Sequence, residues 1–180
     1  RLKGPATAAL LERDDPSQCA DADLLVAPDR CEAASAALRD AGFVALDDPL
    51  RPVERSVHSD TFARAGLGTT LDLHRSFPGL LVDPADAWTV LWQRRTPLTV
   101  AGELLQVPDG AATALLIALH AARNGYGTGL SSTDLRRALD RLDDEAWCET
   151  FALAEQLNAT QALVAGVRFL PRGRELSVLH

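Results

Sequence analysis

The fold of this chain is decided by one stretch, DADLLVAPDRCEAASAALRDAGFVAL, which occupies residues 21–46. Within it, residues 23–27 are rich in Leu and Val and too short for a helix before the following proline, so they predict a buried strand. Residues 28–42 have Pro and Asp at the front, Ala and Leu at helical spacing, and a glycine where a helix would end, and they predict a helix. Residues 43–46, FVAL, predict a second strand. The stretch is therefore typical of the strand–helix–strand unit of an α/β sheet.

Further elements are predicted on both sides of this unit. Residues 53–58 (VERSVH) and 69–74 (TTLDLH) alternate between two faces and predict two more strands. A proline followed by Ala and Leu predicts a short helix over residues 5–12, and an amphipathic pattern predicts another over 84–95. Residues 98–107, LTVAGELLQV, predict a hairpin that turns at its Ala-Gly pair.

After Pro108 the composition shifts to Ala and Leu at helical spacing. We therefore expect an α/β (α+β) fold in two parts, with an α/β core including the hairpin at residues 1–107 and a helical region at residues 108–180. The core should contain a small mixed sheet with flanking helices, and the second part should form a helical bundle. The helices predicted there span residues 109–123, 132–142, 143–157 and 160–170.

Composition limits the classes of function. The chain has 180 residues, and its 18 Lys and Arg against 25 Asp and Glu give a net charge of -7. This charge disfavours a long nucleic acid as partner, because the phosphate backbone would be repelled. A small molecule or a protein is a more natural partner.

The expected location is the cytoplasm. No apolar run approaches the length of a membrane span, and we see no secretory signal. The three cysteines are widely spaced without a Cys-x-x-Cys pair, so they predict reduced thiols and not a zinc site. The sequence contains no Met and begins at Arg1, so we expect a segment to precede it.

Three aspartates in the predicted strands are candidate metal ligands. Asp21 and Asp23 are two residues apart and face the same way in a strand, and Asp72 on a neighbouring strand can face them. Like charges raise one another's pKa, so such a cluster persists mainly where a cation offsets the repulsion, and Mg²⁺ prefers such oxygen ligands. The alternative interpretation is that an Asp-x-Asp pair caps a turn or faces solvent, which is common.

The motifs in order resemble the uncharacterised bacterial nucleotidyltransferase family of the DNA polymerase β-like superfamily. The resemblance covers nearly the whole chain, and its combination of motifs is specific although each motif alone is weak. Relatives carry a Lys-Gly element, an Asp-x-Asp followed by Leu-Leu-Val, and an Asp or Glu two residues before a His. The matching segments here are LKG (2–4), DADLLV (21–26), LRDAGF (38–43), LDLH (71–74), LTVAGELLQVP (98–108), LLIALHAARNGYG (115–127) and TDLRRAL (133–139).

The resemblance implies roles for five residues. Asp21 and Asp23 would be the metal-binding pair and Asp72 the third carboxylate, with Mg²⁺ or Mn²⁺ as the ion. Lys3 and Gly4 would stand where the superfamily holds the triphosphate at a helix N-terminus, and free N–H groups and a Lys charge favour phosphate at such a position. The implied reaction is attack of an acceptor on the α-phosphate of an NTP such as ATP, with release of pyrophosphate.

His74 follows Asp72 by two residues, so it shares a strand face with Asp72. It is a candidate contact for phosphate or for a metal-bound water, and a structural histidine bonded to a carboxylate is an equal alternative.

Two basic pairs, Arg94–Arg95 and Arg136–Arg137, are best interpreted as solvated residues or carboxylate partners. If they face the metal site, they would guide a triphosphate.

Two alternatives to an active transferase remain open. One is a nucleotide-binding or partner-binding module that keeps the fold without catalysis. The other is a toxin-like transferase that acts on RNA. Relatives often have an Arg shortly before the Asp-x-Asp pair, where residues 18–20 of this chain read Gln-Cys-Ala. This departure is the reason for considering an inactive member.

Overall fold

The computed structural model describes residues 5–11, 21–46, 58–125, 127 and 129–179. Its strands are β1 (Asp21–Leu25), β2 (Val44–Ala45), β3 (Ser59–Ala63), β4 (Thr70–His74), β5 (Arg95–Val100) and β6 (Glu103–Pro108). Its helices are α1 (Pro5–Leu10), the short 3₁₀ helix η2 (Pro28–Arg30), α2 (Cys31–Asp40), α4 (Pro84–Gln93), α5 (Gly110–Asn124), α6 (Leu130–Arg141), α7 (Asp144–Gln156), α8 (Thr160–Val167) and α9 (Pro171–Leu179). The architecture is a mixed α/β fold with a small sheet and flanking helices.

The main sheet has four strands in the order β1-β4-β3-β2. β1 pairs with β4 in parallel, and β3 pairs antiparallel with both β4 and β2. Phe62 of β3 and Leu73 of β4 are 1% and 2% exposed, so one face of these strands is packed in the interior. Because side chains alternate along a strand, the residues on either side of Leu73 belong to the opposite face.

β5 and β6 form a separate antiparallel hairpin. Its turn contains Ala101 and Gly102, both with positive φ, as a two-residue hairpin turn requires. The hairpin joins α4 to α5.

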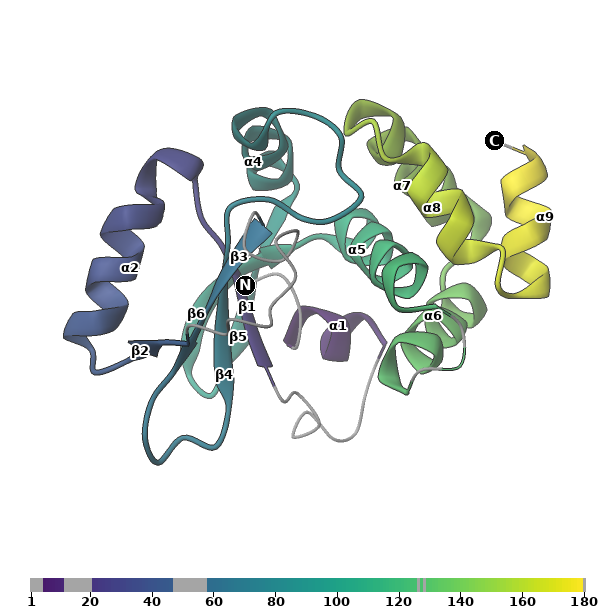
Figure 1. Ribbon diagram of the computed structural model, residues 1–180. Coiled ribbons are helices and arrows are strands. Elements are labelled where there is room, and N and C mark those ends of the chain that lie inside the picture. Colours follow the sequence, from purple (N-terminus) through teal and green to yellow (C-terminus); the bar gives the residue numbers. More distant parts are fainter. Residues whose placement is uncertain (1–4, 12–20, 47–57, 126, 128, 180) are drawn as a thin grey trace.

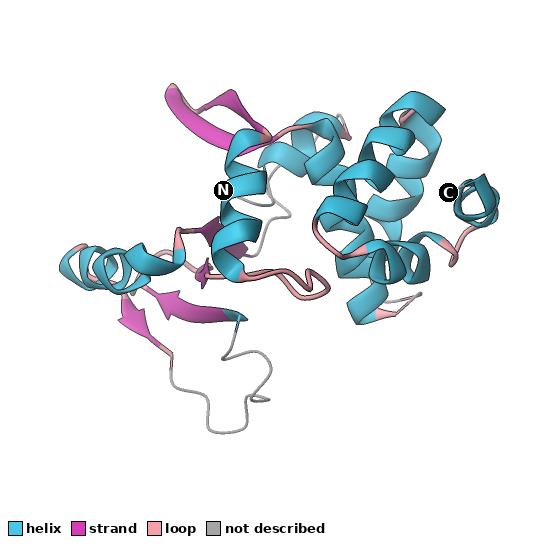
Figure 2. Cartoon of the chain, turned by 90° about the horizontal axis from the view of Figure 1, so that it is seen from above, coloured by secondary structure: helices cyan, strands magenta, loops and turns pink. Residues whose placement is uncertain are grey.

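The two views of the chain agree on its layout. α2 lies at one end of the molecule and α6, α7, α8 and α9 lie at the other, with the four-stranded sheet between them (Figures 1 and 2).

The hydrophobic core is centred on α5, which is apolar nearly all round. α5 packs against α6, α7 and α8, and the same apolar cluster includes Leu11, Phe77 and Leu91 from outside the bundle. Helix α8 approaches α5 closely at Gly166, where an added Cβ would lie 2.1 Å from the carbonyl oxygen of Ala118. The core therefore contains residues from both sides of Pro108. The division of the chain at residue 107 stays a proposal, and it marks the point where strands and helices give way to helices alone.

The structure confirms the predicted strand–helix–strand unit and the hairpin. β1 begins two residues earlier than predicted, and α4 ends at Gln93, so the hairpin is longer than residues 98–107. Residues 53–57 of the expected strand at 53–58 lie outside the described residues, while His58 precedes the observed strand β3. The prediction of a strand ending at residue 58 is therefore wrong for His58.

The helical half matches the prediction with two corrections. The predicted helix over 160–170 ends at Val167, and a further helix, α9, follows from Pro171. A proline fits the first turn of a helix, where its missing N–H costs nothing, so Pro171 begins a new helix. Among the described helices, none has the length and apolar character needed to cross a bilayer.

Candidate metal centre

The pairing of β1 with β4 brings Asp23 and Asp72 together. The two residues are Cα partners in the parallel register, and paired residues of neighbouring strands present their side chains on the same face. The amide of Val26 extends this pairing by donating to the carbonyl oxygen of His74, 3.0 Å away. Two carboxylates that are 49 positions apart in the printed sequence thus share one small area of the sheet.

His74 joins this pair from the end of β4. Its Nε2 lies 2.8 Å from Oδ1 of Asp23, and the two side chains are only 7% and 9% exposed. Its other ring nitrogen, Nδ1, is buried and has no hydrogen-bond partner in the part of the chain that the structure describes. The ring also lies 5.9 Å from that of Phe77, measured between centroids.

Asp23, Asp72 and His74 form a group that can hold a metal ion. One ligand atom of each residue lies within 4.8 Å of the others. Asp23 and His74 are buried and Asp72 is half-buried. Burying charge is costly unless it is paired or coordinates a metal. The donor set, two carboxylates and one imidazole in a partly dry site, therefore fits a divalent cation.

Thr61 of β3 supports Asp72 from the other side. Thr61 and Asp72 are antiparallel partners, and the Thr61 hydroxyl donates to Oδ1 of Asp72 over 2.6 Å. This bond occupies one oxygen of the Asp72 carboxylate and fixes its orientation. Thr61 was missed by sequence reasoning because its strand was placed elsewhere. The segment SDTFA offered no signal for it, because it has one large apolar residue and no alternation of polar and apolar residues.

Comparison with known proteins identifies the family. The model of a family described as uncharacterised nucleotidyltransferase matches residues 1–172. The chain belongs to this nucleotidyltransferase family. The crystal structure of an antigenic nucleotidyltransferase-like protein from Paracoccidioides brasiliensis is similar at 17% identity and a TM-score of 0.43, over 91% of this chain and 83% of that one. No curated protein matches the chain.

The remaining site residues expected of a nucleotidyltransferase are described only in part. Asp21 lies at the start of β1, where its backbone pairs with Thr70. Its side chain is outside the described part of the structure, as are Lys3 and Gly4. The predicted roles of these three residues therefore stay predictions.

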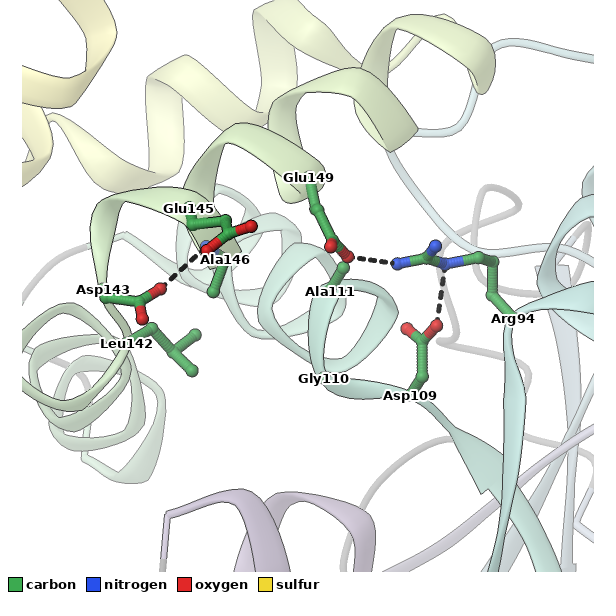
Figure 3. Close-up of a pocket in the computed structure, with 9 residues that line it drawn as sticks. All are labelled: Arg94, Asp109, Gly110, Ala111, Leu142, Asp143, Glu145, Ala146 and Glu149. Carbon is green, nitrogen blue, oxygen red and sulfur yellow. Dashed lines mark hydrogen bonds and ion pairs between the residues drawn. The ribbon is translucent and has the colours of Figure 1, made fainter.

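Arg94 has carboxylate partners. Its Nε lies 2.7 Å from Oδ2 of Asp109, and a terminal nitrogen lies 3.0 Å from Oε2 of Glu149 (Figure 3). These residues line a cavity of about 340 Å³ together with Gly110, Ala111, Leu142, Asp143, Glu145 and Ala146. Four carboxylates and one guanidinium give the cavity a negative balance, which repels a triphosphate. Arg94 is thus a carboxylate partner, which was the preferred interpretation of the basic pairs.

The other basic residues lie elsewhere. The guanidinium of Arg95 is 4.1 Å from the ring centroid of Trp92, an arrangement that is attractive between a cation and an aromatic face. Arg136 and Arg137 are exposed on α6.

Proposed function

We propose that the chain transfers a nucleoside monophosphate from an NTP to an acceptor and releases pyrophosphate. The observation that carries this proposal is the pairing of Asp23 with Asp72, which gathers two carboxylates and His74 within 4.8 Å. The family supports the class of reaction. In the reaction, an acceptor oxygen bonds to the α-phosphorus, the bond from that phosphorus to the β-phosphate oxygen breaks, and the acceptor gives up its proton.

Asp23 and Asp72 would hold the divalent cation, Mg²⁺ or Mn²⁺, and Asp21 would add a third carboxylate. A cation bound there neutralises phosphate charge and lowers the pKa of the attacking group. Asp72 is the best candidate to help orient or deprotonate the acceptor, because Thr61 fixes the orientation of its carboxylate beside the proposed cation. His74 would orient Asp23 and contact the triphosphate or a bound water from the same face of the sheet.

Lys3 and Gly4 are proposed to contact the triphosphate. This part of the proposal rests on the resemblance of LKG to the family's Lys-Gly element. Substituting Lys3 by Met removes the charge and keeps most of the length of the side chain, and the expected result is weaker NTP binding by calorimetric titration. If the K3M variant bound the NTP with the same affinity as wild type, Lys3 would not be a triphosphate contact.

The proposal is tested by identifying the product that leaves the nucleotide. The protein is incubated with ATP, GTP, CTP or UTP, a divalent cation and a fractionated cell extract, and pyrophosphate and inorganic phosphate are measured separately. Nucleotidyl transfer yields one pyrophosphate for each nucleotide consumed. Release of phosphate alone, with nucleoside diphosphate left behind, would contradict the proposal.

The second candidate function is a nucleotide-binding or partner-binding module without catalysis. The observation that favours it is the bond between His74 and Asp23, which occupies an oxygen that a metal would use. Calorimetric titration with each NTP, with and without Mg²⁺, would then show binding while no pyrophosphate is formed. If NTPs labelled at the α-phosphate are used and the label is found on RNA, a toxin-like transferase would be supported instead.

A further inference from the structure

We infer that His74 is a direct metal ligand and that the cluster binds a first-row transition ion, with Mn²⁺ as the probe, in preference to Mg²⁺. The inference rests on the proposed function only in placing a cation at Asp23 and Asp72. It goes beyond that function because it changes the ligand set from oxygen alone to oxygen and nitrogen. Three arguments carry it.

The first argument is the distance between the two buried ligand atoms. Ligands at roughly 2.1 Å from an octahedral ion and at right angles to each other are about 3.0 Å apart. Nε2 of His74 and Oδ1 of Asp23 are 2.8 Å apart. In the hydrogen bond these two atoms share one proton. If an ion replaced that proton, the two atoms would need to move apart by only a few tenths of an ångström.

The second argument is the burial of two carboxylates beside one imidazole. The side chains of His74 and Asp23 are 7% and 9% exposed, and Asp72 is half-buried. Charge buried in this way is costly unless it is paired or coordinates a metal. One proton shared between His74 and Asp23 does not offset the second carboxylate, that of Asp72. A cation bound to all three side chains offsets both carboxylates.

The third argument is the origin of the three side chains. Asp72 and His74 share β4, Asp23 is on the adjacent β1, and Thr61 of β3 fixes Asp72. Ligands on neighbouring strands keep their spacing better than ligands on loops. The set leaves positions on an octahedral ion for water or phosphate oxygens. A nitrogen ligand favours transition ions over Mg²⁺, which prefers oxygen.

The other histidines of the described residues offer a matched control. Nδ1 of His58 lies 2.6 Å from Oγ of Ser76, and Nε2 of His120 lies 2.8 Å from Nδ2 of Asn124. Neither belongs to a group of three metal-binding side chains in the described structure. His120 is half-buried on α5, so a His120→Gln variant controls for the loss of an imidazole elsewhere in the molecule.

The experiment measures metal binding without nucleotide. Mn²⁺ is titrated into wild type, His74→Gln and His120→Gln, free Mn²⁺ is followed by electron paramagnetic resonance, and Mg²⁺ is added as competitor. Pulsed resonance on the bound Mn²⁺ then detects any directly coordinated nitrogen. We expect wild type and H120Q to bind Mn²⁺ at least about tenfold tighter than Mg²⁺ and to show the nitrogen signal. H74Q should lose the signal and most of the preference.

Three results would overturn the inference: no Mn²⁺ binding by wild type, bound Mn²⁺ without a nitrogen signal, or equal affinity for the two ions. If H74Q fails to fold, as circular dichroism would show, the nitrogen signal of wild type decides alone. Failure of the inference is distinct from failure of the proposed function. A nitrogen signal without nucleotidyl transfer would support His74 as a metal ligand and contradict the proposed function. Nucleotidyl transfer with bound Mn²⁺ that shows no nitrogen signal would support the proposed function and contradict the inference.

Discussion

The imidazole Nε2 of His74 lies 2.8 Å from the carboxylate Oδ1 of Asp23, although 51 residues separate the two in the sequence. Both side chains are buried next to a second carboxylate, that of Asp72. Apolar side chains in these positions would cost less to bury. Buried polar groups that cost stability in this way are expected at functional sites. The cluster of Asp23, Asp72 and His74 is therefore expected to be functional.

The first prediction concerns Asp72→Asn. The change removes one negative charge, while the amide oxygen can still accept the bond from Thr61. We expect nucleotidyl transfer to fall below detection and Mn²⁺ affinity to fall by about 100-fold, while Tm stays within about 3 °C of wild type. Asp86→Asn, at an exposed position in the first turn of α4, is the matched control. If D72N retained nucleotidyl transfer, Asp72 would not be a catalytic residue.

The second prediction concerns Thr61→Val, which keeps the shape of the side chain and removes its donor. Without that donor Asp72 can rotate, so metal affinity and transfer should each fall by about 10- to 100-fold. Thr69→Val is the control, because the Thr69 hydroxyl is exposed and donates to the carbonyl oxygen of Thr70. Equal losses in T61V and T69V would point to a general effect on the sheet.

The third prediction concerns Arg94→Met. The guanidinium bridges Asp109 at the start of α5 and Glu149 on α7, and its side chain is 35% exposed. Because the pairs are partly solvated, the free energy of unfolding in urea should fall by only about 1 kcal/mol. Metal and NTP binding should be unchanged, since the cavity around Arg94 is negatively charged. A clear loss of NTP affinity in R94M would show that Arg94 faces the nucleotide after all.

The fourth prediction compares two glycines. A Cβ at Gly166 would lie 2.1 Å from the Ala118 carbonyl oxygen, whereas the nearest atom to a Cβ at Gly110 is Leu10 Cδ1 at 3.8 Å. Gly166→Ala should therefore cost about 3 kcal/mol, a fall in Tm of roughly 6–12 °C, because α5 and α8 must move apart. Gly110→Ala should leave Tm unchanged or slightly higher. Calorimetry on both variants checks the close packing of α8 on α5.

Much of the fold was predictable because its elements carry strong local signals. The strand–helix–strand unit has a short apolar run, a helical Ala and Leu pattern and Gly42 at φ 85°, and the hairpin has its Ala-Gly turn. β3 was missed because SDTFA contains one large apolar residue, Phe62, and no repeated pattern. α9 was missed because PRGRELSVL has an interior glycine, Gly173, whose value lies in its contact with the backbone of Val167.

The candidate site was predictable only as a set of residue types. Spacing placed Asp21 with Asp23 and Asp72 with His74, but one sequence does not give the register of two strands. The register of β1 and β4 makes Asp23 and Asp72 partners, and tertiary packing then joins His74 to Asp23. Thr61 comes from a strand outside every motif, so its contact with Asp72 required the structure.

The central claim is that the cluster of Asp23, Asp72 and His74 serves metal-dependent nucleotidyl transfer. The most direct measurement follows label from NTPs carrying ³²P at the α- or the γ-phosphate into a cell extract, with wild type and Asp72→Asn compared. The account predicts a labelled acceptor from the α-position alone, only with divalent metal, and only with wild type. Label from the γ-position, or equal α-label with D72N, would contradict it.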